Sequence, residues 1–424
     1  MSATASLQLQ RRYTRSDPRG AFPRLPASPD IEHNRLAMFW RPLIDMTDSA
    51  LAPMHVRMIA PVSGWLARPE PGRRSWFAMI AVAGLRHQVV RHAGLDRYDC
   101  REPTGLTEQL RTPRWNTLLD VIARFRDLDD GTRALLVFQL AQLSYCQYVF
   151  ALTGVVRPDG DPEHDRYAYE VARVHARYPG HTDRALAVYD ALAEHDADPL
   201  LALAACAQGI SNAIRGAQDT SLGRSFETRG QRAAARLGDQ WHSWLVISRF
   251  HRAVALLRMA ERDADGMQHE LHAATIANDR LTASAPEDTD ALVALENSRI
   301  LTESKIKAAG RAPTGETARQ VRAWSQELAD LDPNCPEARI IAGDGYVTTG
   351  DYAHAAVQYI RAGELGTTAG AMGYYRAGQC FDALGDRSNA INAMARCLEL
   401  DGSAIEPRTY LEAHGAAPPG GDTP

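Results

Sequence analysis

The chain has 424 residues, of which 45% are hydrophobic and 23% are charged. This composition is typical of folded proteins, and the length suits two or three domains or one long helical array. The formal net charge of −5 argues against a general nucleic-acid binder, which is usually basic. The longest apolar stretch, from Trp76 to Leu85, is too short to span a bilayer. We therefore expect neither a nucleic-acid partner nor a membrane partner.

The cysteines are scattered along the chain without any CxxC pair. They are Cys100, Cys146, Cys206, Cys335, Cys380 and Cys397. A chain of this size does not need disulfides to stabilise its fold. The cysteine usage therefore favours a reducing cytoplasm as the compartment.

The basic residues are almost all arginine, since only Lys305 and Lys307 are lysines. A bias that extends over the whole chain is typical of a genome that favours arginine codons. The alternative is selection for guanidinium groups, which make forked contacts to carboxylate or phosphate. No GxxxxG precedes either lysine, which excludes a P-loop.

In chain order, residues 1–29 carry Arg, Pro, Ser and Gly with few apolar residues in register, which predicts a disordered tail. Residues 415–424 have the same character. Between these tails, apolar residues recur at helical spacing, with Pro and Gly where helices should stop. Alternating β-branched runs are missing. The expected fold is therefore all-α, built from antiparallel helical hairpins.

The segment from Arg157 to Pro162, which carries two Pro and one Gly, is the best candidate for an internal boundary. Residues 30–157 are richer in large apolar side chains and predict a compact N-terminal helical domain. Residues 158–414 are rich in alanine and more regularly amphipathic, which predicts a helical repeat domain.

An internal repeat with a period of 35 residues supports the second domain. Eleven positions match at this one offset, and eight of the eleven pairs are identical. The pairs are Ala342/Ala377, Gly343/Gly378, Tyr346/Phe381, Gly350/Gly385, Asp351/Asp386, Ala355/Ala390, Tyr359/Met394, Arg361/Arg396, Ala362/Cys397, Glu364/Glu399 and Leu365/Leu400.

The matched residues suggest how each hairpin is packed. Gly343 allows the paired helix to approach closely, and Gly350 ends the first helix in a left-handed conformation that suits glycine. Tyr359 and its counterpart Met394 are expected to pack toward the next hairpin.

This pattern resembles the tetratricopeptide repeat (TPR) family, whose period is 34 residues and whose small, aromatic and alanine anchors have these offsets. The resemblance covers residues 328–402. Upstream, the segment from Thr182 to Tyr189 resembles another second helix. The resemblance implies a TPR-like α-solenoid that binds a protein or peptide.

In the TPR family, ligands usually lie on the concave face made by the first helices of the hairpins. The resemblance implies a binding groove at Glu337, Ile340, Asp344, Val347, Met372, Tyr375, Gln379 and Asp382. Members that bind C-terminal carboxylates use Lys and Asn at these places, and this chain has neither. The acidic residues instead suggest a groove that accepts basic or neutral segments.

Motifs that could carry chemistry are incomplete. His269 and His272 are three residues apart and share a helix face, but no third metal ligand is apparent. The acidic run from Asp127 to Asp130 and the segment from Asn278 to Thr282 only partly match magnesium motifs for diphosphates. We therefore predict no metal site and no cofactor.

Two functions follow from these patterns. The first is a protein- or peptide-binding scaffold without its own catalysis. The alternative is an enzyme or an enzyme subunit that tailors a small molecule or peptide, with a site in the N-terminal domain. A deep pocket lined by Trp76, His87 or Arg91 would favour this alternative.

Overall fold

A computed structural model describes residues 119–142, 146–177, 180–195, 197–284, 288–310, 313–331, 336–365, 370–402 and 404–419. Within these ranges the chain forms helices and no β-strand, which confirms the all-α prediction. The predicted tail 1–29 and most of the predicted domain 30–157 lie outside the described residues.

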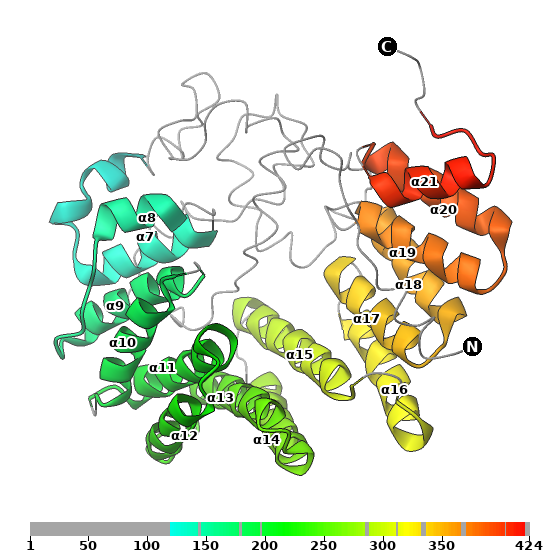
Figure 1. Cartoon of the computed structure of the whole chain (residues 1–424). Helices are drawn as coiled ribbons and strands as arrows, with labels where there is room; N and C mark the ends of the chain where they lie inside the picture. The colour runs from blue at the N-terminus through cyan, green and yellow to red at the C-terminus, as the bar shows by residue number, and fades with distance from the viewer. Residues whose placement is uncertain are drawn as a thin grey trace.

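The helices follow one another with short connections (Figure 1). Their bounds are η6 Phe125–Asp127, α7 Asp130–Gln142, α8 Cys146–Thr153, α9 Pro162–His175, α10 Thr182–Ala193, α11 Pro199–Asn212, η7 Ala213–Ala217, α12 Thr220–Ala234, α13 Trp241–Ala260, α14 Ala264–Ser284, α15 Asp288–Ala308, α16 Gly315–Leu331, α17 Pro336–Thr348, α18 Tyr352–Leu365, α19 Gly370–Ala383, α20 Arg387–Leu400 and α21 Ile405–Ala413. No helix in the described ranges has the length and apolar character needed to cross a membrane.

The helices form two layers of an open arc. From α7 to α21, every helix packs against the one that follows it, and the odd-numbered helices from α7 to α19 also touch one another in sequence. We call the odd-numbered helices A helices and the even-numbered ones, α8 to α20, B helices. Figure 1 shows the arc, with α12 and α14 on its outer rim and α15 toward its inner side. The arrangement is the TPR-like solenoid that the sequence predicts.

Several A helices end in the same backbone motif. Gly350, Gly385 and Gly415 have positive φ values of 76°, 79° and 69°. At the first of these, the Gly350 N–H donates to the Val347 carbonyl at 3.0 Å, and the Asp351 N–H donates to the Tyr346 carbonyl at 2.9 Å. This pair of bonds is a Schellman motif, which glycine favours because it has no Cβ.

Helix α13 ends in the same motif without a glycine. Arg262 occupies the left-handed position at φ 62°, and the Asp263 N–H donates to the Arg258 carbonyl at 2.9 Å. The Asp263 carboxylate then accepts a 2.8 Å bond from the Gly266 N–H and so caps the N-terminus of α14. Hairpin α13–α14 therefore repeats the junction of α17–α18, although its sequence lacks the glycine anchor.

Glycines on one helix receive large side chains from the facing helix. A Cβ at Gly343 would lie 2.5 Å from the Tyr359 ring, and one at Gly378 would lie 2.8 Å from Met394 Cε. Tyr359 and Met394 therefore pack on the first helix of their own hairpin, whereas the sequence suggested packing toward the next one. Tyr359 also belongs to a hydrophobic cluster that includes Cys380 of α19.

Glycines also allow close packing in the first half of the arc. Gly209 of α11 faces the ring of Phe226 on α12, where an added Cβ would lie 2.6 Å away. Gly230 of α12 receives the ring of Phe250 from the next hairpin. Phe226 and Phe250 are among the largest fully buried side chains, so these contacts lie in the core.

One hydrophobic cluster includes residues on both sides of the predicted boundary between residues 157 and 158. Val149 and Val156 precede it, whereas Tyr167 and Val171 follow it, and all four are buried in this cluster. The division into domains therefore stays a prediction.

We expect Gly350→Ala to lower the free energy of unfolding by about 1 kcal/mol, because alanine resists a positive φ. Arg262→Gly should raise the free energy of unfolding by a similar amount for the same reason. Gly238→Ala is the control, because Gly238 has no positive φ and open space around it. Denaturant unfolding measures all three, and equal effects at Gly350 and Gly238 would contradict the backbone argument.

We expect Gly209→Ala to destabilise the protein by about 1–3 kcal/mol, because the new methyl group overlaps the Phe226 ring. Phe226→Leu in the same chain should restore part of that loss by making room. Unfolding of the two single variants and the double variant tests this contact. If the double variant loses as much unfolding free energy as the two single variants together, the added methyl group and the Phe226 ring do not overlap.

Candidate binding face

The predicted groove residues lie on two neighbouring A helices. Helix α17 carries Glu337, Ile340, Asp344 and Val347, and helix α19 carries Met372, Tyr375, Gln379 and Asp382. The side chain of Glu337 lies outside the described residues. The two helices touch each other, so the structure brings the remaining seven residues onto one stretch of the A layer.

The apolar groove residues already contribute to packing between hairpins. Val347 is 4% exposed and Tyr375 is 5% exposed. Ile340 and Met372 are half-buried against the neighbouring hydrophobic clusters. A ligand on this face can therefore reach only parts of Ile340 and Met372 unless the helices move apart.

Asp344 is bonded to both neighbouring helices. Its Oδ1 accepts a hydrogen bond from the Tyr359 hydroxyl at 2.5 Å and forms an ion pair with Arg376 of α19. Burial, together with the Asp344 carboxylate, raises the pKa of Tyr359 well above its ordinary value. The charge of Asp344 is thus matched within the protein, and this residue joins α17, α18 and α19.

The polar groove residues of α19 also have partners. Gln379 Nε2 donates to the Tyr375 hydroxyl at 2.8 Å. Asp382 is exposed and accepts a 2.7 Å bond from the Tyr410 hydroxyl of α21. Asp382 is therefore a more accessible acid than Asp344.

A cluster of arginines lies on α9, just after α9 and on α13, in the first half of the arc. Glu170 of α9 is 3% exposed, and Arg173 Nη1 donates to both of its carboxylate oxygens at 2.9 Å. Arg177 and Arg249 also act on this carboxylate. Burial nevertheless raises the pKa of Glu170, because desolvation outweighs these positive charges.

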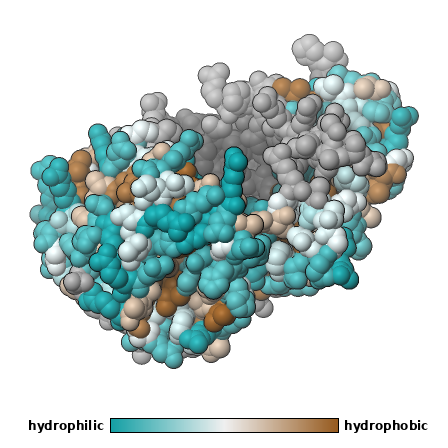
Figure 2. All heavy atoms as spheres, turned by 60° about the horizontal axis from the view of Figure 1, so that its bottom comes forward, coloured by the Kyte–Doolittle hydropathy of each residue, from teal (hydrophilic) through white to brown (hydrophobic). Residues whose placement is uncertain are grey.

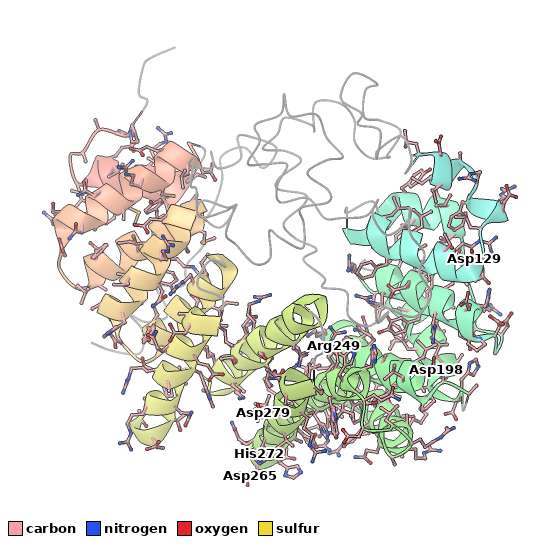
Figure 3. The ribbon with its side chains drawn as sticks, turned by 180° about the vertical axis from the view of Figure 1, so that it is seen from behind. Asp129, Asp198, Arg249, Asp265, His272 and Asp279 are labelled. Carbon is pink, nitrogen blue, oxygen red and sulfur yellow. The ribbon has the colours of Figure 1, made fainter. Side chains whose placement is uncertain are left out.

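Two neighbouring A helices, α11 and α13, add no negative charge to this cluster. Helix α11 carries no charged residue, and α13 carries three arginines and no Asp or Glu. Figure 3 shows Arg249 toward the inner side of the arc, whereas Asp265, His272 and Asp279 lie along α14. We name Arg173, Arg177 and Arg249 with Glu170 the central arginine cluster.

The segment from Asn278 to Thr282 contributes to packing. Asn297 Nδ2 of α15 donates to Asn278 Oδ1 at 2.9 Å and to Ser248 Oγ at 3.0 Å. The Ser248 hydroxyl in turn donates to the Ala274 carbonyl at 3.0 Å. These buried bonds join α13, α14 and α15. They occupy the side-chain amide of Asn278, which would have to be free to bind a metal ion and a diphosphate.

The other candidate motifs are accounted for by surface contacts. His269 and His272 are exposed, and Glu270 between them pairs with His251 at 2.6 Å. Within the described ranges, no group of three or more His, Cys, Asp or Glu side chains is arranged to hold a metal ion. Trp76, His87 and Arg91 lie outside those ranges.

Two of the cysteine thiols are buried and weakly acidic. Burial raises the pKa of both Cys206 and Cys380 to about 12. A thiol with such a pKa is protonated at neutral pH and is a poor nucleophile. Both side chains therefore act as small core residues.

The hairpin geometry defines the chain as an all-α solenoid of TPR-like hairpins, and comparisons with known proteins add little. No model of a known protein family matches the chain, and no curated protein sequence matches it. A solved structure to which it is similar is the crystal structure of the APC/C hetero-tetramer Cut9–Hcn1, with 12% identity over 78% of this chain and 84% of that chain. The TM-score is 0.21, so the assignment rests on the junctions and the packing described above.

Figure 2 shows the outer side of the arc with mixed polar and apolar residues and without a broad apolar patch over the coloured surface. The exposed large apolar side chains in the described ranges are scattered: Val155, Met259, Ile276, Val357, Leu384 and Ile405. Scattered apolar residues are normal on a protein surface.

We expect Asp344→Ala to destabilise the protein by about 2 kcal/mol, because it leaves Arg376 and the Tyr359 hydroxyl without their acceptor. Asp382→Ala should cost about 0.5 kcal/mol, since its single bond is exposed. Tyr359→Phe added to Asp344→Ala should cost less than the sum of the two single changes. Urea unfolding measures each variant, and equal losses at Asp344 and Asp382 would contradict this difference.

Proposed function

We propose that the protein is an interaction scaffold without its own catalysis, and that a peptide segment of a partner protein lies along its A helices. The continuous A layer supports this proposal, because α9 and α13, which carry Arg173 and Arg249, belong to the same layer as α17 and α19. Hairpins held together by buried contacts supply a preformed surface, which reduces the entropic cost of binding.

The charges of the A layer suggest the character of the partner. Three guanidinium groups act on the Glu170 carboxylate in the central arginine cluster, and this concentration of arginines favours acidic side chains of a partner. Arginine suits this role because its planar group makes two parallel hydrogen bonds to one carboxylate. The exposed Asp382 favours a neutral or basic stretch of the same partner near α19.

Asp344 enters this proposal differently from the other groove residues. Arg376 already matches its charge, and its loss would disturb three helices. A loss of binding in Asp344→Ala would therefore not identify a contact with the partner. Asp382 is the better residue for testing the α17–α19 face.

Substitution in the central arginine cluster tests the proposal. A partner captured with the full-length protein from its host is first identified, and its dissociation constant is then measured by calorimetry at two salt concentrations. We expect Arg177→Gln combined with Arg249→Gln to weaken binding at least tenfold and to reduce its salt dependence, because an attraction between opposite charges is lost.

Arg319→Gln is the matched control, because Arg319 lies on B helix α16 with 70% of its side chain exposed. Arg249→Lys keeps the positive charge but removes the planar guanidinium group that makes two parallel hydrogen bonds, so we expect an intermediate affinity. Thermal melting of every variant separates lost binding from lost folding. Unchanged affinity in the folded double variant would exclude the cluster as the binding site.

A further inference from the structure

A separate pocket lies at the start of the described chain, away from the groove residues. It has a volume of about 450 Å³ and is bounded by η6, by the segment that follows α8, and by the first turns of α9. This volume lies within the range of small-molecule sites in proteins.

The pocket has an apolar wall and one tyrosine hydroxyl group. Phe125 and Val156 are 7% and 8% exposed, and Leu152 packs partly buried beside them. Tyr167 is 4% exposed and meets the Phe125 ring edge-on, with the ring centres 6.3 Å apart.

The Tyr167 hydroxyl has no hydrogen-bond partner among the described residues. Burial raises the pKa of Tyr167 to about 12, so the hydroxyl keeps its proton and remains a donor at neutral pH. The oxygen of this hydroxyl is accessible from the pocket, so it can donate a hydrogen bond to a bound group. A ligand that supplies an acceptor would bind this donor in place of solvent.

Two guanidinium groups complete the polar lining. Arg126 and Arg157 are exposed at the pocket, and neither side chain forms a hydrogen bond or ion pair with the rest of the described chain. Both are available as donors of forked hydrogen bonds.

Arg133 and His164 hold the pocket in shape. Arg133 Nε donates to the Phe125 carbonyl at 3.1 Å, and its Nη2 donates to the Arg126 carbonyl at 2.6 Å. His164 Nδ1 lies 2.7 Å from Asp130 Oδ2, and its Nε2 lies 3.0 Å from the Arg157 carbonyl. These contacts fix the two chain segments that carry Arg126 and Arg157, and they also match the charge of Asp130.

We propose that this pocket binds a carboxylate attached to an apolar group. The carboxylate accepts hydrogen bonds from the Tyr167 hydroxyl and from the guanidinium groups of Arg126 and Arg157, while the apolar group packs against Phe125, Leu152 and Val156. A neutral amide of the same shape is rejected, because its N–H₂ group would face donors. The ligand is either a free organic acid or the terminal carboxylate of a partner chain.

Calorimetry on the full-length protein tests the site with phenylacetate and its neutral isostere phenylacetamide. A short peptide that ends in phenylalanine, with a free carboxylate or as the amide, forms the second arm. We expect each acid to bind at least tenfold more tightly than its amide. Tighter binding of phenylacetate than of the peptide indicates a free acid as the ligand, and the reverse indicates a partner's terminus.

Tyr167→Phe is the decisive variant, because it removes only a hydroxyl group that forms no hydrogen bond with the described residues. Its melting temperature should be unchanged, whereas its affinity for the acid falls about fivefold, as expected for the loss of one hydrogen bond. Arg157→Gln should weaken binding about tenfold, and Arg319→Gln should not affect it.

If none of the four probes shows saturable binding, the proposal is overturned. Equal binding of acid and amide, or unchanged affinity in Tyr167→Phe and Arg157→Gln, would overturn it as well. The central arginine cluster contributes none of these residues, so failure here leaves the scaffold proposal unaffected.

Discussion

The distance between facing helices is the constraint on which the solenoid depends. Where two helices come close, one carries a glycine and the other places an aromatic ring or a methionine over it, as in Gly209 with Phe226 and Gly343 with Tyr359. The ring fills the space that a Cβ would take, so packing density and helix spacing are set together. The same contact occurs between hairpins, where Gly363 of α18 receives Tyr374 of α19.

This close packing also determines which charges are available for binding. Asp344 and Arg376 are 32 residues apart in the chain but form an ion pair because α17 and α19 are neighbours in the A layer. The acid that suggested a basic partner is therefore matched from within. Around Glu170, three arginines act on one buried carboxylate. The charge of the binding face thus follows from packing as much as from composition.

A hairpin could be recognised in the sequence only where its small, aromatic and glycine positions keep both their residue type and their spacing. Hairpins α17–α18 and α19–α20 were predicted because the same residues recur at one offset. Hairpin α13–α14 lies in the predicted repeat domain, but the repeat was not matched there because Arg262 occupies the left-handed position that glycine marks elsewhere. In hairpin α11–α12 the repeat was not matched because the π-helical turn Ala213–Ala217 adds a residue between Gly209 and Phe226 and so shifts the period.

The sequence by itself determined the fold class, the helix-ending glycines at 350 and 385, and the small residues on which neighbouring helices close, because these depend on local backbone conformation and side-chain size. Only the tertiary structure decided which charges are matched, which groove residues are buried and where a pocket forms. Tyr167, Arg126 and Arg157 share no motif and come from three separate elements. Their relation is a matter of distance in space, which the order of residues along the chain does not contain.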